Sequence, residues 1–289
     1  MLTLDEKKIR KGKPVGLPYV GSKKKVSKKI AQIIAQNFGT DKTVYDLFGG
    51  GGAVSLEMKL NGFNEVHYNE LDEMTVAAFK AAMYEDFDVR DLIATREEFF
   101  EIRDSEHDGI YELKLLVNSF GNDRRSYLYS KINSEQKTSL ARKIVEEEKE
   151  WRKYKQTSTY KEYVIYKDEN IGVIQQIGRI QQIERIQQVD GAITVTNKDY
   201  KEFSGLNGAL IYLDPPYENA TNKYQTGKFD SSEFYNWAYE MSKNNIVIIS
   251  SYEVIDERFN LVFEFENAHS TLSAKGVGKR TEKLFMVKC

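Results

Sequence analysis

The sequence predicts an α/β fold built on a mostly parallel sheet, with a smaller helical domain inserted into it. Short apolar runs alternate with helical patterns near the start of the chain, and the same alternation returns near its end. The segment between these two parts shows helical patterns alone. With 289 residues, of which 40% are hydrophobic, the chain is long enough to bury a core in this arrangement.

The first alternating segment predicts two strands and two helices. The strands are expected at 43–47 and 65–69, and the helices at 53–60 and 72–83. The first of these helices is expected to stop near Asn61-Gly62, because glycine is the common residue just past a helix end. The pattern is that of a βαβ unit, in which the two strands run parallel.

The remaining elements complete this organisation. Later strands are expected at 192–196, 209–213, 246–250, 261–265 and 283–288, with a helix at 232–243. The central helices are expected at 97–102, 110–117, 135–154 and 171–189, the last with isoleucine at every third position from 171 to 186 as a packed surface. We therefore assign residues 1–85 and 169–289 to a sheet domain and residues 86–168 to an inserted helical domain.

Composition excludes several classes of protein. The single cysteine, Cys289, excludes internal disulfides and thiolate-rich metal sites, and three scattered histidines argue against zinc, so no metal is expected. No stretch reaches the roughly 18 apolar residues that cross a bilayer, and the lysine-rich start lacks the apolar core of a secretory signal. We expect a cytoplasmic protein without a membrane partner.

A basic segment stands out against the net charge of −2. Residues 7–29 hold ten lysines or arginines and no acid, a run that either neutralises phosphates or forms a solvated face. Within it, Tyr19-Val20-Gly21-Ser22-Lys23 presents an aromatic ring and an amine just before a helix. That helix carries apolar residues on one face, namely Val26, Ile30, Ile33, Ile34 and Phe38.

The tetrapeptide Asp214-Pro215-Pro216-Tyr217 directly follows the expected strand 209–213. Two prolines cannot continue a sheet ladder, so the strand must stop there. The carboxyl end of a strand in an open α/β sheet is where ligands bind. A planar amine fits this turn, with the Asp214 side chain and the Pro215 carbonyl accepting its hydrogen bonds and Tyr217 stacking on its ring.

A glycine turn, Asp46-Leu47-Phe48-Gly49-Gly50-Gly51-Gly52, follows the first expected strand and opens the next helix. Gly50 and Gly52 allow an anionic group to approach the free N–H groups of the helix start. Ser55 replaces the third glycine of a dinucleotide fingerprint, and Glu70 is placed to accept hydrogen bonds from ribose hydroxyls. Together the two turns suggest methyl transfer from S-adenosylmethionine to an exocyclic nitrogen of a base.

Motifs in this order resemble those of the Dam-like (D12 class) DNA adenine-N6 methyltransferase family, over nearly the whole chain. The motifs are Tyr19-x-Gly21-x-Lys23, Asp46-x-Phe48-x-Gly50-x-Gly52, Asn69-Glu70, Ser119-Phe120-Gly121-Asn122, Asp199-Tyr200, Asp214-Pro215-Pro216-Tyr217, Ile249-Ser250-Ser251-Tyr252 and Glu282-Lys283-Leu284-Phe285. The chain departs from the family pattern in two places. Glu70 stands where Asp is common, and the inserted domain matches poorly.

The resemblance implies a Rossmann-like S-adenosylmethionine-dependent methyltransferase sheet whose insertion is a target-recognition domain. It implies methylation of a flipped-out adenine in duplex DNA, with the catalytic residues Asp214, Pro215, Pro216 and Tyr217. The cofactor contacts that it implies are Tyr19, Lys23, Phe48, Gly50, Gly52, Glu70 and Asp214. Asp199, after the strand 192–196, either accepts a hydrogen bond from the adenine amino group of the cofactor or caps a helix.

In the inserted region, Asn122, Arg124 and Arg125 beside Tyr127 predict a DNA-contacting loop. Amide and guanidinium groups can pair bidentately with adenine and guanine edges. The alternative is an ordinary solvated loop.

Three other functions stay open on the sequence. An RNA adenine-N6 methyltransferase carries the same turns, and a cytosine-N4 methyltransferase shares the mechanism but more often has Ser in place of Asp214. A catalytically inactive DNA-binding relative keeps the fold, although a competent residue fills each catalytic position here. The sequence leaves open the recognition sequence, the oligomeric state and whether a cognate restriction endonuclease accompanies the protein.

Overall fold

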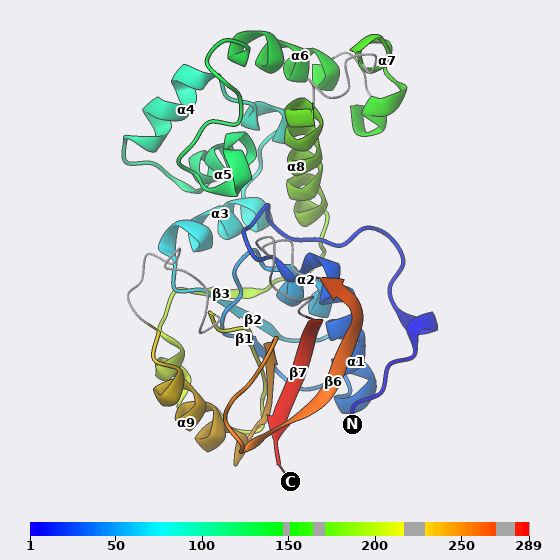
Figure 1. Ribbon diagram of the computed structural model, residues 1–289, viewed down its shortest axis with the longest axis vertical. Helices are drawn as coiled ribbons and strands as arrows, with labels where there is room; N and C mark the ends of the chain where they lie inside the picture. The colour runs from blue at the N-terminus through cyan, green and yellow to red at the C-terminus, as the bar shows by residue number, and fades with distance from the viewer. Residues whose placement is uncertain (147–150, 164–170, 217–228, 270–280, 289) are drawn as a thin grey trace. The chain divides into compact units, whose positions relative to one another are not determined.

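The chain folds into two compact units (Figure 1). A computed structural model describes residues 1–146, 151–163, 171–216, 229–269 and 281–288. Unit 1 comprises Met1–Val15, Gly21–Val76 and Asp190–Cys289, and unit 2 comprises Gly16–Val20 and Ala77–Val189. In the described ranges, no helix has the length and apolar character needed to cross a bilayer.

Unit 1 is built on one sheet that contains the seven strands of the described residues, in the order β3-β2-β1-β4-β5-β7-β6. These strands are β1 Val44–Asp46, β2 Val66–Asn69, β3 Thr194–Thr196, β4 Leu210–Leu213, β5 Ile246–Ser251, β6 Phe259–His269 and β7 Thr281–Val287. The first five run parallel, and β7 is antiparallel to both β5 and β6. The sheet is therefore mostly parallel, as the sequence predicts.

The order of the strands reverses between β1 and β4. Val44 of β1 lies opposite Val66 of β2 on one side and opposite Leu210 of β4 on the other. From this centre the chain builds outward through β2 and β3 in one direction and through β4 and β5 in the other. Such a reversal leaves a crevice at the carboxyl ends of the two central strands, where α/β proteins bind their ligands.

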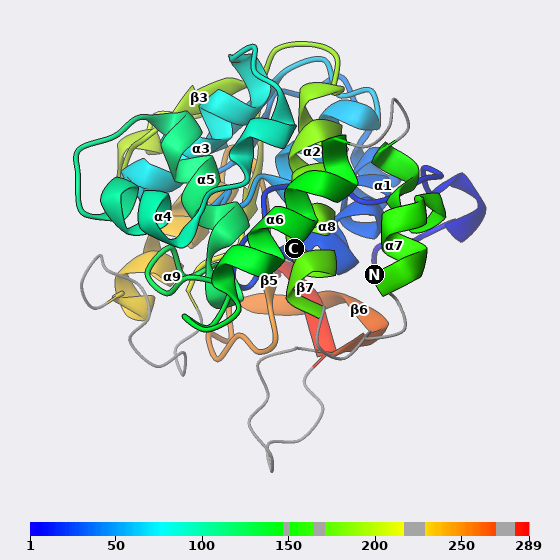
Figure 2. The same cartoon turned by 90° about the horizontal axis from the view of Figure 1, so that it is seen from above.

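Helices cover both faces of the sheet (Figures 1 and 2). On one face α9 (Ser231–Ser242) packs Phe234 and Ala238 into a core cluster that includes Ile211, Leu213 and Ile249. On the other side lie α1 (Ser27–Phe38) and α2 (Ala53–Leu60), as Figure 2 shows. All four residues of β4 are buried, as expected for a central parallel strand.

Unit 2 is helical. Its helices in the described residues are the carboxyl-terminal part of α3 (Glu73–Tyr84), α4 (Arg96–Arg103), α5 (Gly109–Asn118), α6 (Ser134–Glu146), α7 (Ser158–Tyr163) and α8 (Ile171–Gln187). The isoleucines at 177, 180, 183 and 186 of α8 are fully buried and Ile174 is half-buried, which confirms the carboxyl-terminal part of the predicted packed surface. Unit 2 is longer than the predicted segment 86–168, because it also includes Gly16–Val20, residues 77–85 and α8, which the sequence assigned to the sheet domain. The assignment of target recognition to this segment stays a prediction.

We predict that Gly49→Ala destabilises the protein by about 1–3 kcal/mol, as overpacking does in a well-packed interior. A Cβ atom on Gly49 would lie 2.4 Å from the ring of Tyr68, which is fully buried and donates its hydroxyl to the Gly50 carbonyl oxygen at 2.7 Å. The measurement is the midpoint of urea unfolding. Gly205→Ala is the matched control, since its Cβ would meet no atom within 4 Å, and equal midpoints for the two variants would contradict the prediction.

Candidate active site

Three carboxyl groups converge at the crevice between β1 and β4. Asp46 ends β1 opposite Tyr212 of β4, and Asp214 follows β4 directly. Glu70 follows the neighbouring strand β2. Burial raises the pKa of Asp46 to about 7, and the nearby charges of Asp214 and Glu70 add to this rise. Acidic groups held this close to one another are typical of a functional site.

Lys23 neutralises part of this negative charge. Its Nζ atom lies 2.7 Å from Asp214 Oδ1 and 3.5 Å from Glu282 Oε2, and the residue is 9% exposed. Glu282, on β7, also accepts a hydrogen bond of 2.8 Å from the Ser250 hydroxyl on β5. Burial lowers the pKa of Lys23, but the two carboxylates outweigh it and raise that pKa, so the amine stays charged at neutral pH.

The protonation state of Asp214 determines whether its side chain can accept hydrogen bonds from a ligand. Burial raises its pKa, the charge of Lys23 opposes the rise, and the pKa is about 6. At neutral pH the side chain is therefore mainly a carboxylate and accepts hydrogen bonds. Pro215 beside it is buried and Pro216 is half-buried, while Tyr217 lies outside the described residues.

The glycine turn before α2 has a backbone that requires glycine at two positions. Gly50 and Gly52 have φ values of 48° and 70°, and Gly52 adopts the left-handed conformation directly before the first helical residue. The turn is closed by a hydrogen bond from the Gly52 N–H to the Gly49 carbonyl oxygen, and the Gly49 N–H donates to the Asn69 carbonyl oxygen of β2. The predicted turn is thus fixed between the ends of β1 and β2.

Asp46 joins this turn to the helix. Its Oδ2 atom accepts hydrogen bonds from the Ser55 N–H at 3.2 Å and the Ser55 hydroxyl at 2.6 Å. Its Oδ1 atom is buried and has no hydrogen-bond partner among the residues that the structure describes. A buried oxygen left unpaired is costly, so this atom is suited to a donor on a bound molecule.

Glu70 holds the loop that follows β2. One carboxylate oxygen accepts from the Gly50 N–H at 2.8 Å, and the other accepts from the Leu71 and Asp72 N–H groups at 2.8 and 3.0 Å. Burial raises the pKa of Glu70, and these hydrogen bonds oppose the rise. The acid therefore lies beside the glycine turn, where the sequence predicts it.

Two further predicted cofactor contacts, Phe48 and Asp199, belong to unit 1, where Phe48 packs on the residue after Asp199. The ring of Phe48 packs at 5.5 Å from that of Tyr200 and at 5.7 Å from that of Phe234. Asp199 accepts a hydrogen bond of 2.9 Å from the Lys201 N–H and caps a short 3-10 helix, Tyr200–Phe203. The helix-cap alternative for Asp199 is therefore what the structure shows, and its cofactor role stays a prediction. Tyr19 belongs to the Gly16–Val20 segment of unit 2 and is half-buried.

A comparison with known families identifies the family of the chain. The model of the D12 class N6 adenine-specific DNA methyltransferases matches residues 19–269, which include the Lys23 turn, the glycine turn and Asp214. The chain belongs to this family. No curated protein matched the chain. The methyltransferase thus acts on the N6 atom of adenine in DNA, and members of its family use S-adenosylmethionine.

The predicted DNA-contacting loop of the methyltransferase is the tip of a small hairpin in unit 2. Ser119 and Tyr127 form an antiparallel bridge, and the Phe120 N–H donates to the Ser126 carbonyl oxygen at 2.7 Å. Asn122 and Arg124 at the tip both have a φ of 60°, a conformation uncommon outside glycine. The bridge, the hydrogen bond and the positive φ values together determine the conformation of the tip.

The side chains of this hairpin differ in their exposure, and so in whether they can contact DNA. Arg125 is exposed, whereas Arg124 is half-buried and lies 3.3 Å from Glu112. The predicted contact of Tyr127 with DNA stays a prediction. Tyr127 is 6% exposed, and its hydroxyl hydrogen-bonds to the Ala94 carbonyl oxygen and to Thr138, so it supports the hairpin from within unit 2.

Several residues that position the site were not assigned a role from the sequence. Ser250 and Glu282 fall in the family motifs, and that was the one signal that singled them out. Arg179 of α8 donates to the carbonyl oxygens of Val117 and Ser119 at 2.9 and 2.6 Å, and so fixes the base of the hairpin. Among the described residues, no group of three or more His, Cys, Asp and Glu side chains could hold a metal ion.

We predict that Lys23→Met raises the pKa of Asp214 above its value of about 6, because the positive charge that opposes the effect of burial is removed. The measurement is a pH titration of the ¹³Cγ signal of Asp214 by NMR, assigned by its loss in Asp214→Asn. Lys25→Met, which changes an exposed lysine of the same turn, should leave the titration where it is. An unchanged or lower pKa in Lys23→Met would show that Lys23 does not control Asp214.

Proposed function

We propose that the methyltransferase acts on an adenine flipped out of duplex DNA, and that Asp214 and the Pro215 carbonyl oxygen accept the two hydrogen bonds of its amino group. The observation that supports this most strongly is the Asp214 carboxylate, held 2.7 Å from Lys23 at the crevice between β1 and β4. A base inside a duplex cannot enter such a crevice, and flipping it out costs a few kcal/mol.

The two hydrogen-bond acceptors, Asp214 and the Pro215 carbonyl oxygen, would make the adenine amino group a better nucleophile. The amino group of adenine is a poor nucleophile, because its lone pair is delocalised into the ring. Acceptors placed on both N–H bonds favour the pyramidal nitrogen and direct its lone pair outward. Asp214 serves in this way only as a carboxylate, and Lys23 favours that form. The two prolines fix the backbone that carries both acceptors.

The cluster also suits the methyl donor of the family. S-adenosylmethionine supplies an electrophilic methyl group on a sulfonium, together with an ammonium group and two ribose hydroxyls. The buried Asp46 Oδ1 atom lacks a donor in the described residues and fits an ammonium group. Glu70 fits ribose hydroxyls. Gly50 and Gly52 leave room for the donor because they have no side chains, while their N–H groups already donate to Glu70 and to the Gly49 carbonyl oxygen.

Lys23 takes a different role from the one that the resemblance implies. Its amine already lies against Asp214 and Glu282, so we propose that it sets the charge and position of Asp214 and acts on the cofactor through that residue. Phe48, Asp199 and Tyr19 are retained as proposed cofactor contacts. Among them, Phe48 is the best placed in unit 1, because it lies two residues after the end of β1 and directly before the glycines of the turn.

Target recognition is proposed for the segment 86–168, with Asn122 and Arg125 at the hairpin tip reading base edges. The exposed guanidinium of Arg125 and the fixed backbone of the tip support this assignment. We also propose that the protein is cytoplasmic and that it acts in restriction–modification beside a cognate endonuclease. The test of the second role is whether DNA methylated by this protein resists cleavage by that endonuclease.

We predict that Asp214→Asn lowers the rate of methyl transfer at saturating substrates by about 100-fold or more, in line with the loss of one oriented polar group in other enzymes. The measurement is transfer of labelled methyl from S-adenosylmethionine to duplex DNA, with the modified nucleoside identified by mass spectrometry. For the unaltered enzyme, the rate should fall as the pH is lowered through about 6, since protonation removes the acceptor.

Asp190→Asn is the control, because Asp190 is an exposed acid of unit 1 at a distance in sequence from every motif. It should retain the full rate. Near-normal turnover in Asp214→Asn would refute the assignment of the acceptor. Methylated cytosine as the product would refute the adenine pocket.

A further inference from the structure

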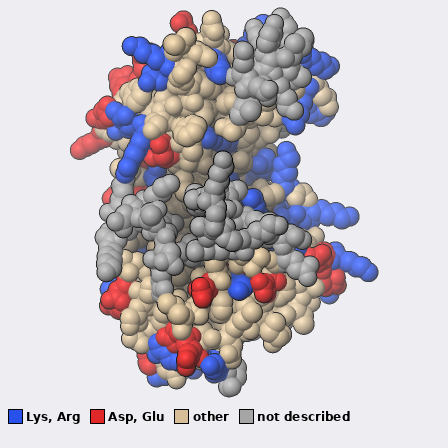
Figure 3. Space-filling view, in the orientation of Figure 1, with Lys and Arg blue, Asp and Glu red and all other residues tan. Residues whose placement is uncertain are grey.

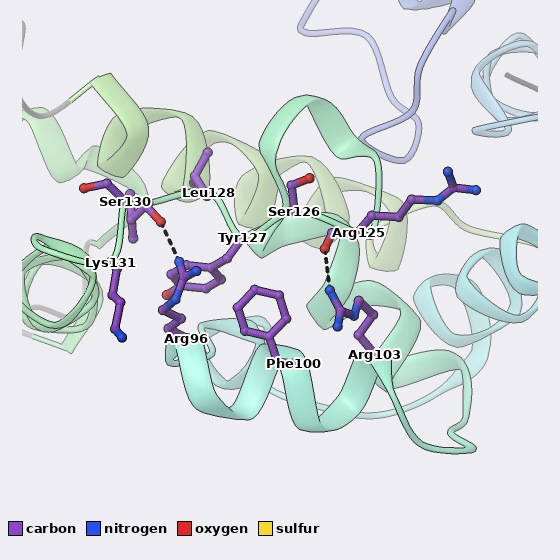
Figure 4. Close-up of a pocket in the computed structure, with 10 residues that line it drawn as sticks. Arg96, Phe100, Arg103, Arg125, Ser126, Tyr127, Leu128, Ser130 and Lys131 are labelled. Carbon is purple, nitrogen blue, oxygen red and sulfur yellow. Dashed lines mark hydrogen bonds between the residues drawn. The ribbon is translucent and has the colours of Figure 1, made fainter.

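A shallow cleft of about 470 Å³ lies within unit 2, between α4 and the segment that follows the hairpin (Figure 4). Helix α4 contributes Arg96, Phe100 and Arg103, and the other wall includes Arg125, Tyr127 and Lys131. Four of these six side chains are cationic. The three α4 residues share one face because they are spaced by four and three positions.

The two arginines of α4 are held in fixed positions. Figure 4 shows the Phe100 ring between them, with the guanidinium carbons of Arg96 and Arg103 at 4.9 and 4.6 Å from the ring centroid. Arg96 Nη1 donates to the Tyr129 carbonyl oxygen at 3.0 Å, and Arg103 Nη1 donates to the Arg125 carbonyl oxygen at 3.1 Å. Each guanidinium keeps further N–H groups for a ligand, because it has five in all.

The positive charge of the cleft is largely unbalanced. Arg103 pairs with Asp104 at 2.7 Å, but Arg96, Arg125 and Lys131 have no carboxylate within ion-pair distance among the described residues. Oriented guanidinium groups match the oxygens of a phosphate, and aromatic contacts reduce the flexibility that binding would otherwise remove. The cleft is therefore built for an anion with several oxygens.

The basic segment at residues 7–29 offers fewer available charges than its composition suggests. Arg10 pairs with the buried Glu57 at 2.8 Å, Lys29 pairs with Glu6 at 2.6 Å, and Lys23 is held by Asp214. Lys28 donates to the Gly12 carbonyl oxygen at 2.8 Å. Figure 3 shows acidic and basic side chains on both units, so the surface drawn there is not uniformly basic.

We propose that the cleft of Arg96, Arg103 and Lys131 binds the phosphodiester backbone of DNA and supplies much of the sequence-independent affinity. The proposal rests on duplex DNA as the substrate. Arg125 links the cleft to the hairpin tip, since its carbonyl oxygen anchors Arg103 at the cleft while its side chain extends away from Phe100 (Figure 4). A backbone held here fixes the register in which the tip meets the bases, which is the usual part that phosphate contacts play.

The test is the salt dependence of binding, measured by fluorescence anisotropy with a duplex that the enzyme methylates and an unrelated duplex of equal length. Arg96→Gln keeps an amide donor for the Tyr129 carbonyl oxygen, and Lys131→Gln changes an exposed side chain, so both should fold. The logarithm of the association constant falls linearly with the logarithm of the salt concentration. Each lost phosphate contact should make this slope about 0.9 less steep, which corresponds to about eightfold weaker binding at 0.1 M salt. The loss should be equal for the two duplexes.

Two control variants match these changes. Lys25→Gln removes an exposed charge from the basic segment, and Arg90→Gln removes an exposed arginine of unit 2 that pairs with Asp88. Both should leave the slope unchanged. An unchanged slope in Arg96→Gln and Lys131→Gln, with unfolding midpoints equal to that of the parent protein, would overturn the proposal.

A loss of binding seen with the substrate duplex but not with the unrelated duplex would also overturn the proposal, because it would indicate that these residues read bases. The proposed function fails by a separate result. If the parent enzyme leaves duplex adenine unmethylated, the catalytic proposal is wrong, while the slope of binding still reports on the cleft.

Discussion

The ion pair between the buried Lys23 and the half-buried Asp214 is the interaction on which the rest of the site depends. It joins two residues 191 positions apart and places the turn before α1 against the end of β4. Removing one partner of a buried pair leaves an uncompensated charge, at a cost of about 3–5 kcal/mol. Glu282 on β7 completes the contact and Ser250 on β5 holds Glu282, so three strands and the amino-terminal turn are tied to one carboxylate.

The order of the strands explains why the other polar groups gather at the same place. Because β1 and β4 are adjacent and parallel, Asp46, the glycine turn and Asp214 all leave the sheet at one edge. Asn69 then ties the loops after β1 and β3 together, since its side-chain amide donates to the carbonyl oxygens of Leu47 and Lys198. The crevice is thus shaped by the topology, and its charge is set by residues from distant parts of the chain.

Local features were predictable from the sequence, and pairings between distant residues were not. Helix α2 has the predicted bounds, because Gly52 directly precedes it and Asn61-Gly62 directly follows it. β6 runs from Phe259 to His269, longer than the predicted 261–265, since charged residues interrupt the apolar pattern of an edge strand. The burial of Tyr127 could not be predicted, because sequence alone does not tell a buried tyrosine from an exposed one. The pairing of Lys23 with Asp214 and the cation-lined cleft of unit 2 depend on tertiary structure.

The most direct test of the central claim is to find where the methyl donor binds. Ultraviolet cross-linking of S-adenosylmethionine labelled in its methyl group, followed by peptide mapping, reports this position without a reaction. We expect the label in peptides from residues 44–70 or 196–216, which carry the ends of β1, β2, β3 and β4. Label confined to residues 77–189 would place the donor in unit 2 and contradict the site described around Asp214.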